Sequence, residues 1–426
     1  MFFATATPRL TYDALVRSAK IYLKEIPKNY DSAVEKLEEA IEQYADKPPI
    51  EAYLLLGSIH ADKRRYAEMD LNFDAVDSIC RSAATEDIEK TCKDLNVSKR
   101  VDQIRQAQWI EEFNEGASLL GEAKEYEEEY GEIDDEDEKI DILYDLELIY
   151  RDAQKNFNNS TIILEDSSQG WINLGIAYYR LGGVYGRIVQ LDEGSEFEEG
   201  IKNTMKDSAL VSYRQALSKT PDNFDLMSNM ATIYFELQQW EQCAEMFGRM
   251  VALQPDNVSV LQNLSMILSQ LEMDDSVRVI VNKVIELDPG NLDMRLQRGY
   301  DEVSKGADLN SEINKAKEEE VEQAKIDELT EKRNAAYRQV IVDFGKVVEL
   351  APNNYDAWYF LGLCHYFLEE YEKSIEAWEK AHELQPDNPE VLELLAPVYL
   401  KMKMPEKSRE AQKKAEELKA AQSEEP

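Results

Sequence analysis

Thr220-Pro221-Asp222-Asn223 is the first of five phrases of the same form, and their spacing decides the fold. The other four are Gln254-Pro255-Asp256-Asn257, Asp288-Pro289-Gly290-Asn291, Ala351-Pro352-Asn353-Asn354 and Gln385-Pro386-Asp387-Asn388. Three of the four gaps between successive prolines are equal, and the fourth, from Pro289 to Pro352, is almost twice as long. The chain therefore contains an internal repeat of about 34 residues, and the repeat after Pro289 carries a long insertion.

Each phrase marks the end of one helix and the start of the next. A helix does not continue through proline, and the Asp or Asn that follows favours a turn and a new helix start. Between the phrases, apolar residues recur three and four positions apart, which is typical of helices with one buried face. Two short helices cannot bury such faces alone, so neighbouring pairs must stack and share a core.

The two helices of a repeat carry different motifs. They are Trp171-x-x-Leu174-Gly175-x-x-Tyr178 on the first helix and Ala209-x-x-x-Tyr213-x-x-Ala216 on the second, and the first motif returns as Trp358-x-x-Leu361-Gly362-x-x-His365. With the proline period, these residues resemble the tetratricopeptide repeat (TPR), as found in bacterial TPR proteins of unknown role. The resemblance implies an all-α, right-handed superhelical solenoid of about nine stacked helical hairpins that holds another protein and catalyses nothing.

The quality of the repeats divides the chain into five segments. Residues 1–100 are degenerate N-terminal hairpins, 101–167 a degenerate hairpin with an acidic insertion, and 168–291 the core repeats. Residues 292–354 are a repeat with a long charged helical insertion, and 355–426 are the C-terminal repeats with a polar capping helix, which a solenoid needs at its end.

Three insertions separate the two helices of their repeats. They are the acidic run 122–139, the Gly- and Glu-rich segment 182–203 and the charged segment 311–333. The last has helix-forming composition and should lengthen both helices of its hairpin. We interpret the acidic run as a solvated insertion, in preference to a cation site or a binding site for a basic partner, because blocks of like charge usually stay in water. Their register predicts that all three lie along one edge of the solenoid.

The charge limits the choice of partner. The 426 residues carry 48 Lys and Arg against 86 Asp and Glu, a net charge of −38. Nucleic acids and anionic membranes need Lys and Arg at their phosphates, so neither is expected, whereas a basic protein partner is compatible. No apolar run is long enough for a membrane span. No phosphate-binding loop, nucleophile elbow or metal-ligand spacing occurs, so we expect no enzyme, cofactor or metal.

The cysteines and the first residues bear on the compartment. Four cysteines are too few for a disulfide framework, although Cys80 and Cys92 could meet across a helix pair. Cys243 and Cys364 fall on apolar helical positions and are expected in the core. Met1–Pro8 lacks the features of a signal peptide, which predicts a cytoplasmic protein. Removal of a leader would instead place the chain in the bacterial periplasm or, as a lipoprotein, in the envelope.

Candidate binding residues follow from the resemblance, because first helices line the concave groove in TPR proteins. Asn173, Asn229 and Asn263 hold the same repeat position in three successive repeats, which resembles the asparagine ladder of some members. An amide can donate to and accept from a peptide backbone. Aromatic and apolar residues expected on the same side are Tyr179, Phe235, Tyr359, Leu363 and Tyr366. Asn as a tolerated groove residue, and aromatic rings that only pack on the next repeat, remain the alternatives.

Three functional classes stay open. The first is a scaffold or adaptor that binds a protein or peptide in the groove. The second is an acidic chaperone that shields a basic client protein. The third is a structural homo-oligomer joined through the charged hairpin 311–333 or the last helix.

Overall fold

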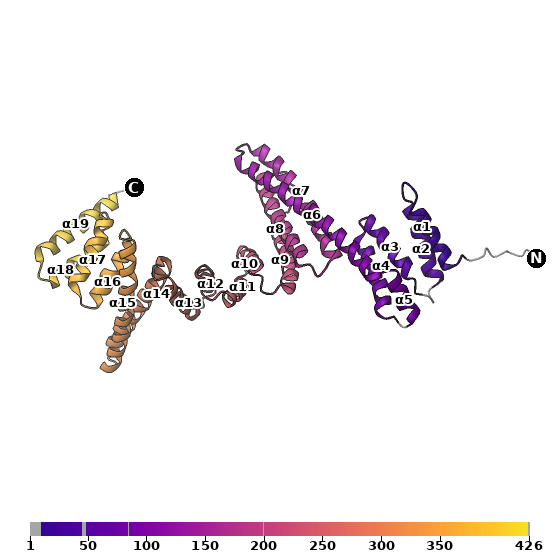
Figure 1. The fold of residues 1–426 in the computed structure, drawn as a ribbon. Coiled ribbons are helices and arrows are strands. Elements are labelled where there is room, and N and C mark those ends of the chain that lie inside the picture. Colours follow the sequence, from indigo (N-terminus) through magenta and orange to yellow (C-terminus); the bar gives the residue numbers. More distant parts are fainter. Residues whose placement is uncertain (1–9, 45–47, 84, 199, 425–426) are drawn as a thin grey trace, which may run out of the picture. The chain divides into compact units, whose positions relative to one another are not determined.

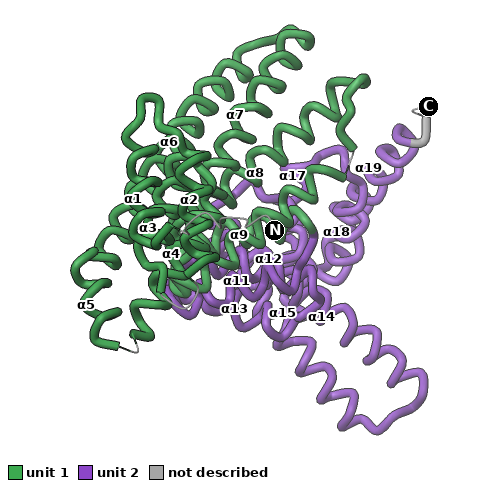
Figure 2. Tube along the Cα trace, turned by 90° about the vertical axis from the view of Figure 1, so that its right-hand side faces the viewer, with its two compact units in different colours: residues 1–237 green, residues 238–426 purple. Residues whose placement is uncertain are grey.

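A computed structural model describes residues 10–44, 48–83, 85–198 and 200–424, and Figure 1 shows them as a succession of helices. The opening segment Met1–Pro8 lies outside the described residues. The chain forms two compact units, residues 1–237 and 238–426 (Figure 2). Every regular element in the described ranges is a helix, which confirms the predicted all-α class.

Unit 1 consists of the antiparallel pairs α1/α2, α3/α4, α6/α7 and α8/α9, with a short α5 after the second pair and α10 at the end. The bounds are α1 Tyr12–Tyr22, α2 Tyr30–Gln43, α3 Ile50–Asp62, α4 Tyr66–Arg81, α5 Glu86–Asp94, α6 Val97–Glu132, α7 Glu136–Ile163, α8 Ser168–Leu191, α9 Ile201–Lys219 and α10 Phe224–Glu236.

Unit 2 begins with α11 and continues with the pairs α12/α13, α14/α15, α16/α17 and α18/α19. The bounds are α11 Trp240–Leu253, α12 Val258–Gln270, α13 Asp274–Leu287, α14 Leu292–Glu318, α15 Gln323–Leu350, α16 Tyr355–Phe367, α17 Tyr371–Leu384, α18 Pro389–Lys401 and α19 Pro405–Glu424. Within each unit the predicted stack of helical hairpins is confirmed, and α19 is the polar helix expected at the end.

The repeated phrases act as helix starts. In all five, the Asn at the end is the N-cap of a first helix, and its side-chain oxygen accepts a hydrogen bond from the backbone N–H two or three residues later. The donor–acceptor distances lie between 2.8 and 3.2 Å. Such a cap stabilises a helix by about 0.5–2 kcal/mol, because a backbone N–H would otherwise lack a partner. The period seen in the sequence is therefore a period of caps.

A glycine on the first helix and an aromatic ring on the second hold most hairpins together. A Cβ added to any of these glycines would overlap the ring opposite it, so the two helices are closer than any larger residue would allow. The aromatic side chains are fully buried or nearly so. The pairs are Gly57–Phe73, Gly116–Phe157, Gly175–Tyr213, Gly299–Phe344, Gly306–Tyr337 and Gly362–Trp378.

The acidic run 122–139 is helical, and all of its acidic side chains except Glu127 are exposed, as a solvated insertion would be. α6 continues through Glu132 and α7 starts at Glu136, so the run forms the tip of a long hairpin. Ala123 is fully buried, and Glu127 forms an ion pair of 2.8 Å with Arg187 on α8. Glutamate is a good helix former, and apolar residues of both helices pack with α8 in one cluster.

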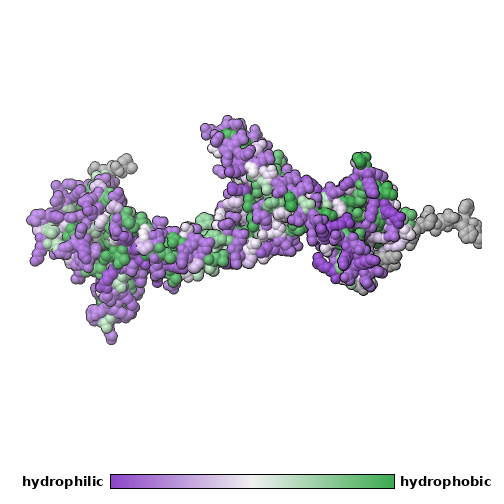
Figure 3. Space-filling view, in the orientation of Figure 1, coloured by the Kyte–Doolittle hydropathy of each residue, from purple (hydrophilic) through white to green (hydrophobic). Residues whose placement is uncertain are grey.

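The segment 182–203 similarly lengthens α8 to Leu191 before a short connection leads to α9. The lengthened parts of α6, α7 and α8 share one apolar cluster, so two of the three insertions are neighbours in unit 1. The third, 311–333, lengthens α14 and α15 of unit 2, as predicted, and its tip has a small core of its own. Figure 3 shows mainly hydrophilic side chains on the tips of α6/α7 and α14/α15.

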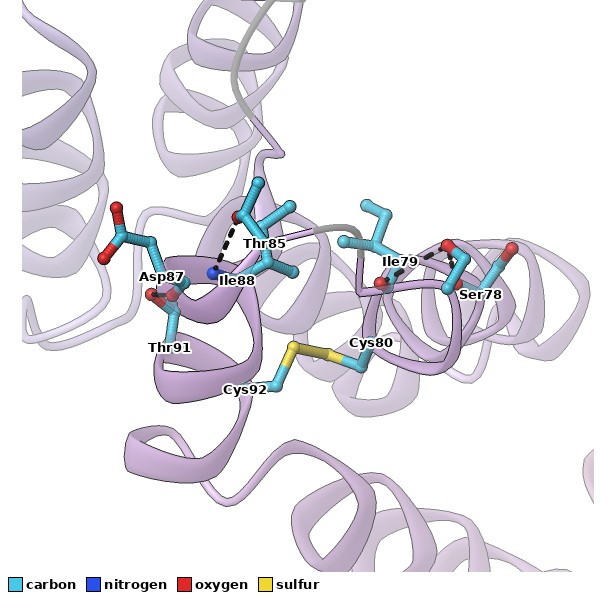
Figure 4. Close-up of a disulfide and its surroundings, with 9 residues drawn as sticks. Ser78, Ile79, Cys80, Thr85, Asp87, Ile88, Thr91 and Cys92 are labelled. Atoms are coloured by element: carbon cyan, nitrogen blue, oxygen red, sulfur yellow. Dashed lines mark hydrogen bonds between the residues drawn. A yellow bond between two sulfur atoms is a disulfide. The ribbon is translucent and has the colours of Figure 1, made fainter.

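Cys80 on α4 and Cys92 on α5 form a disulfide (Figure 4). The other two cysteines, Cys243 and Cys364, are buried thiols, and burial raises the pKa of Cys243 to about 11. The core positions expected for these two residues are confirmed, as is the meeting of Cys80 with Cys92 across two helices.

Candidate binding surfaces

The amides of unit 1 lie on successive first helices. Asn173 on α8 is half-buried, and its Oδ1 accepts a hydrogen bond of 3.3 Å from Nε2 of Gln169, one turn earlier. Asn229 on α10 is exposed. Asn263 lies in unit 2, on α12, and is also exposed. Two of the three amides can therefore reach a ligand, and the ladder itself stays a prediction.

The aromatic residues of unit 1 differ in their surroundings. Tyr179 is half-buried on α8, and its hydroxyl donates a hydrogen bond of 2.7 Å to Glu236 at the end of α10. Burial, followed by this hydrogen bond, raises the pKa of Tyr179 to about 12, so the hydroxyl stays protonated at neutral pH. Phe235 on α10 is 43 % exposed. Tyr179 thus joins two first helices.

The aromatic residues of unit 2 connect α16 to α18. The Tyr359 hydroxyl donates a hydrogen bond of 2.7 Å to Glu390, and burial together with this bond raises its pKa. The ammonium of Lys401 stands 5.0 Å from the centre of the Tyr366 ring. Leu363 and both rings are half-buried against the C-terminal apolar cluster. This packing is the alternative that the sequence left open, and it leaves only part of each side chain for a ligand.

A groove lies in unit 2, where the lengthened α14/α15 hairpin stands beside the turn between α12 and α13. Its volume is about 1060 Å³. We call it the acidic groove, and its charged lining residues are Asp274, Arg278, Asp301, Glu302, Lys305, Asp308, Glu312 and Lys332.

The cations of the acidic groove already have partners. Arg278 lies 3.6 Å from Asp275, Lys305 lies 3.2 Å from Glu302, and Lys332 lies 2.6 Å from Glu328. By contrast, four carboxylates have no ion pair or hydrogen bond with any other described side chain, namely those of Asp274, Asp301, Asp308 and Glu312. The groove therefore has an excess of negative charge.

Asp301 shows the effect of this crowding. Desolvation beside the groove wall, followed by the charge of Asp274, raises the pKa of the Asp301 carboxyl above its ordinary value. A cation that entered the groove would oppose this shift by favouring the ionised form.

The acidic groove was missed from the sequence, because carboxylates are frequent throughout the chain. A usable signal was present. Asp301, Asp308 and Glu312 are seven and four residues apart, which places them on one face of a helix. The spacing indicates a shared face only if α14 continues past the length of a first helix in an ordinary repeat, which the structure shows. Among the described residues, no group of His, Cys, Asp or Glu is arranged to hold a metal ion.

Stacked helical hairpins, five of them starting at an Asn cap and most of the others closed by a glycine–aromatic contact, define a helical-repeat protein of the solenoid class. Three family models, each described as tetratricopeptide repeat, match residues 13–47, 207–265 and 355–388. The chain is a tetratricopeptide-repeat protein. Proteins of this family are generally non-catalytic and bind other proteins.

Several solved structures are similar to the chain. MamA from Desulfovibrio magneticus RS-1 is 20% identical, with a TM-score of 0.33 over 48% of this chain and 97% of that one. YrrB, described as a TPR protein with an unusual peptide-binding site, is 18% identical, with a TM-score of 0.32 over 56% and 96%. A tetratricopeptide repeat protein from Parabacteroides merdae is 14% identical, with a TM-score of 0.33 over 72% and 93%. No curated protein matches the chain.

None of the described helices has the length and apolar character needed to span a bilayer.

Proposed function

We propose that the chain is a non-catalytic scaffold that holds a partner protein by a basic, extended segment bound in the acidic groove of unit 2. The observation that carries the proposal is the set of four carboxylates, none of them in an ion pair, around a groove of about 1060 Å³. Lys or Arg side chains of a partner would supply the missing cations. Nucleic acid and anionic membranes would be repelled by the same charges.

The energy of such binding comes from a few contacts. A hydrogen bond between charged groups contributes about 1.5–3 kcal/mol when it is partly shielded from water. Three or four such bonds would give a binding free energy of about −8 kcal/mol, a micromolar dissociation constant, after the cost of ordering the partner's segment is subtracted. The net charge of −38 would also speed the encounter with a basic partner.

A second candidate uses the exposed amides of the first helices. Asn229 and Asn263 occupy equivalent repeat positions and are both open to solvent, which favours backbone contacts with an extended peptide. In this version a peptide on unit 1 would contact Asn173, Tyr179 and Phe235. Tyr359, Leu363 and Tyr366 would contact a peptide bound on unit 2 by itself. Because amides carry no net charge, binding there would depend little on salt.

The disulfide supports an oxidising compartment, such as the bacterial periplasm or envelope, over the cytoplasm. Disulfides are rare where thioredoxin and glutathione keep thiols reduced.

The proposal is tested with a fluorescent peptide of five Lys-Ala units, whose binding to the full chain is followed by anisotropy. Asp301→Asn/Asp308→Asn removes two groove carboxylates and should weaken binding about tenfold or more. The control Glu286→Gln/Glu416→Gln removes the same charge from exposed positions outside the groove and should have little effect. Affinity should also fall as the pH is lowered through the raised pKa of Asp301, because the protonated carboxyl attracts no cation.

The alternatives give different results. Equal weakening by both variants would contradict a groove site and favour an acidic chaperone that holds basic clients through its whole surface. If a partner captured from the source cells is lost only in Asn173→Ala/Asn229→Ala/Asn263→Ala, and regardless of salt, the amide ladder is the site. A mass in solution above that of one chain would favour the homo-oligomer.

A further inference from the structure

A cavity of about 310 Å³ in unit 1 has the opposite character to the acidic groove. It lies where the lengthened α8/α9 hairpin meets α6 and the end of α10. Four cations face two carboxylates there, in a chain whose acidic residues far outnumber its basic ones. We call it the basic cavity, and its lining is Glu127, Tyr179, Arg180, Gly183, Arg187, Lys202, Lys206 and Glu236.

Two of the four cations form ion pairs within the lining of the basic cavity. Arg187 donates two hydrogen bonds, of 2.8 and 2.9 Å, to the Glu127 carboxylate, and its guanidinium stands 4.8 Å from the centre of the Tyr130 ring. The Lys206 side chain is only 7 % exposed and pairs with Glu236 at 2.8 Å. These two pairs use up both carboxylates of the basic cavity.

The other two cations are open. Arg180 and Lys202 are exposed, and neither forms an ion pair or hydrogen bond with another described residue. They come from different helices, Arg180 from α8 and Lys202 from α9. Beside them, no atom lies within 4 Å of the position that a Cβ on Gly183 would take, so the absence of a side chain leaves room for a ligand.

We infer that the basic cavity binds a phosphate monoester. Its excess of two positive charges matches the charge of about −1.5 to −2 that a phosphate monoester carries at neutral pH. A guanidinium fork and an ammonium suit its three terminal oxygens. A single carboxylate would satisfy one cation only, against the repulsion of a chain with net charge −38. The site lies in another unit and has the opposite charge, so it does not depend on the acidic groove.

Two sources can present this group, a phosphorylated side chain of a partner protein or a small phosphorylated metabolite. Titration calorimetry on the full chain, with phenyl phosphate and with a phosphoserine hexapeptide as probes, distinguishes them. Serine and glutamate forms of the hexapeptide are the reference ligands. Binding should strengthen as the pH rises past about 6, where the second phosphate proton is lost.

Arg180→Gln/Lys202→Gln should weaken the binding of both phosphate probes about tenfold or more. The control Arg17→Gln/Lys155→Gln removes one arginine and one lysine from exposed positions elsewhere in unit 1 and should leave binding unchanged. Gly183→Leu keeps every charge but fills the open space, and it should also abolish binding. It replaces a helix-interior glycine by a better helix former, so folding is favoured rather than impaired.

Similar affinities for phenyl phosphate and the phosphoserine peptide would support a small phosphorylated ligand. A much higher affinity for the peptide would support a phosphorylated partner protein. The inference is overturned if neither phosphate probe binds, if the glutamate peptide binds as tightly as the phosphoserine peptide, or if Arg180→Gln/Lys202→Gln and Gly183→Leu bind like the original chain.

Discussion

At the scale of single residues, the contact between Gly175 and Tyr213 leaves no room for a larger residue in the α8/α9 hairpin. A Cβ at Gly175 would overlap the Tyr213 ring, which is itself buried in the core. Gly175→Ala should therefore destabilise unit 1 by about 1–3 kcal/mol, the usual cost of overpacking a core. The measurement is the midpoint of urea unfolding, followed by the helical circular dichroism signal.

Gly121→Ala is the matched control, because Gly121 is also inside a helix of unit 1 but has nothing within 4 Å of a Cβ. It should raise stability by about 0.5–1 kcal/mol through helix propensity alone. If both substitutions shifted the midpoint equally, the ring contact would have no special role.

The glycines of these contacts and the Asn caps could be predicted from the sequence, whereas the buried ion pairs could not. The glycines and the Asn caps recur with the period, so a motif finds them. Asp343 is fully buried and is bound by Arg295 and Arg298 at 2.9 and 2.6 Å, although these partners lie far before it in the chain. Only the closed hairpin brings them together, and no local pattern distinguishes Asp343 from the many solvated acids.

At the scale of elements, α5 depends on its disulfide. The helix has no buried residue, and only Ile88 and Cys92 pack partly against the neighbouring core. The Cys80–Cys92 bond closes a loop with a sequence separation of 12, for which the chain-entropy model gives about 3 kcal/mol. Reduction should therefore release α5 and leave the large hairpins of unit 1 intact.

Hydrogen exchange detected by mass spectrometry checks this expectation. Exchange in residues 86–94 should accelerate about 100-fold on reduction, whereas exchange in α8 and α9 should not change. Cys80→Ser/Cys92→Ser should behave like the reduced chain and should not respond to the reductant. Two free thiols at these positions in the protein purified without reductant would contradict the bond.

The lengthened hairpins show where reasoning by element reaches its limit. The charged segment 311–333 was correctly predicted to extend α14 and α15, since it has no Pro or Gly and pairs its charges along a helix. The acidic run was expected to be a solvated insertion, because blocks of like charge usually stay in water, and most of its carboxylates are exposed. Its few apolar residues appear isolated in the sequence. They gain a core only when α6, α7 and α8 lie together. Both cavities arise at these lengthened parts, which is why the candidate sites could not be derived from the repeat motif.

At the scale of the whole molecule, the net charge of −38 should make stability depend on salt. Screening acts mainly on charges further apart than the Debye length, which is about 8 Å at 0.15 M and about 20 Å at 0.02 M. The ion pairs of the structure join atoms at about 3 Å and are mostly exposed, so each contributes about 0–1 kcal/mol and salt weakens it only in part. The repulsion among the many acidic side chains is spread over longer distances and is screened strongly.

Raising NaCl from 0.02 to 0.3 M should therefore raise the melting temperature by a few degrees, or about 1 kcal/mol for units of this size. Glu125→Lys/Glu132→Lys changes the net charge from −38 to −34 at two exposed positions of α6, and the salt-dependent rise should be smaller in this variant. A melting temperature that fell with salt would mean that close ion pairs outweigh the distant repulsion.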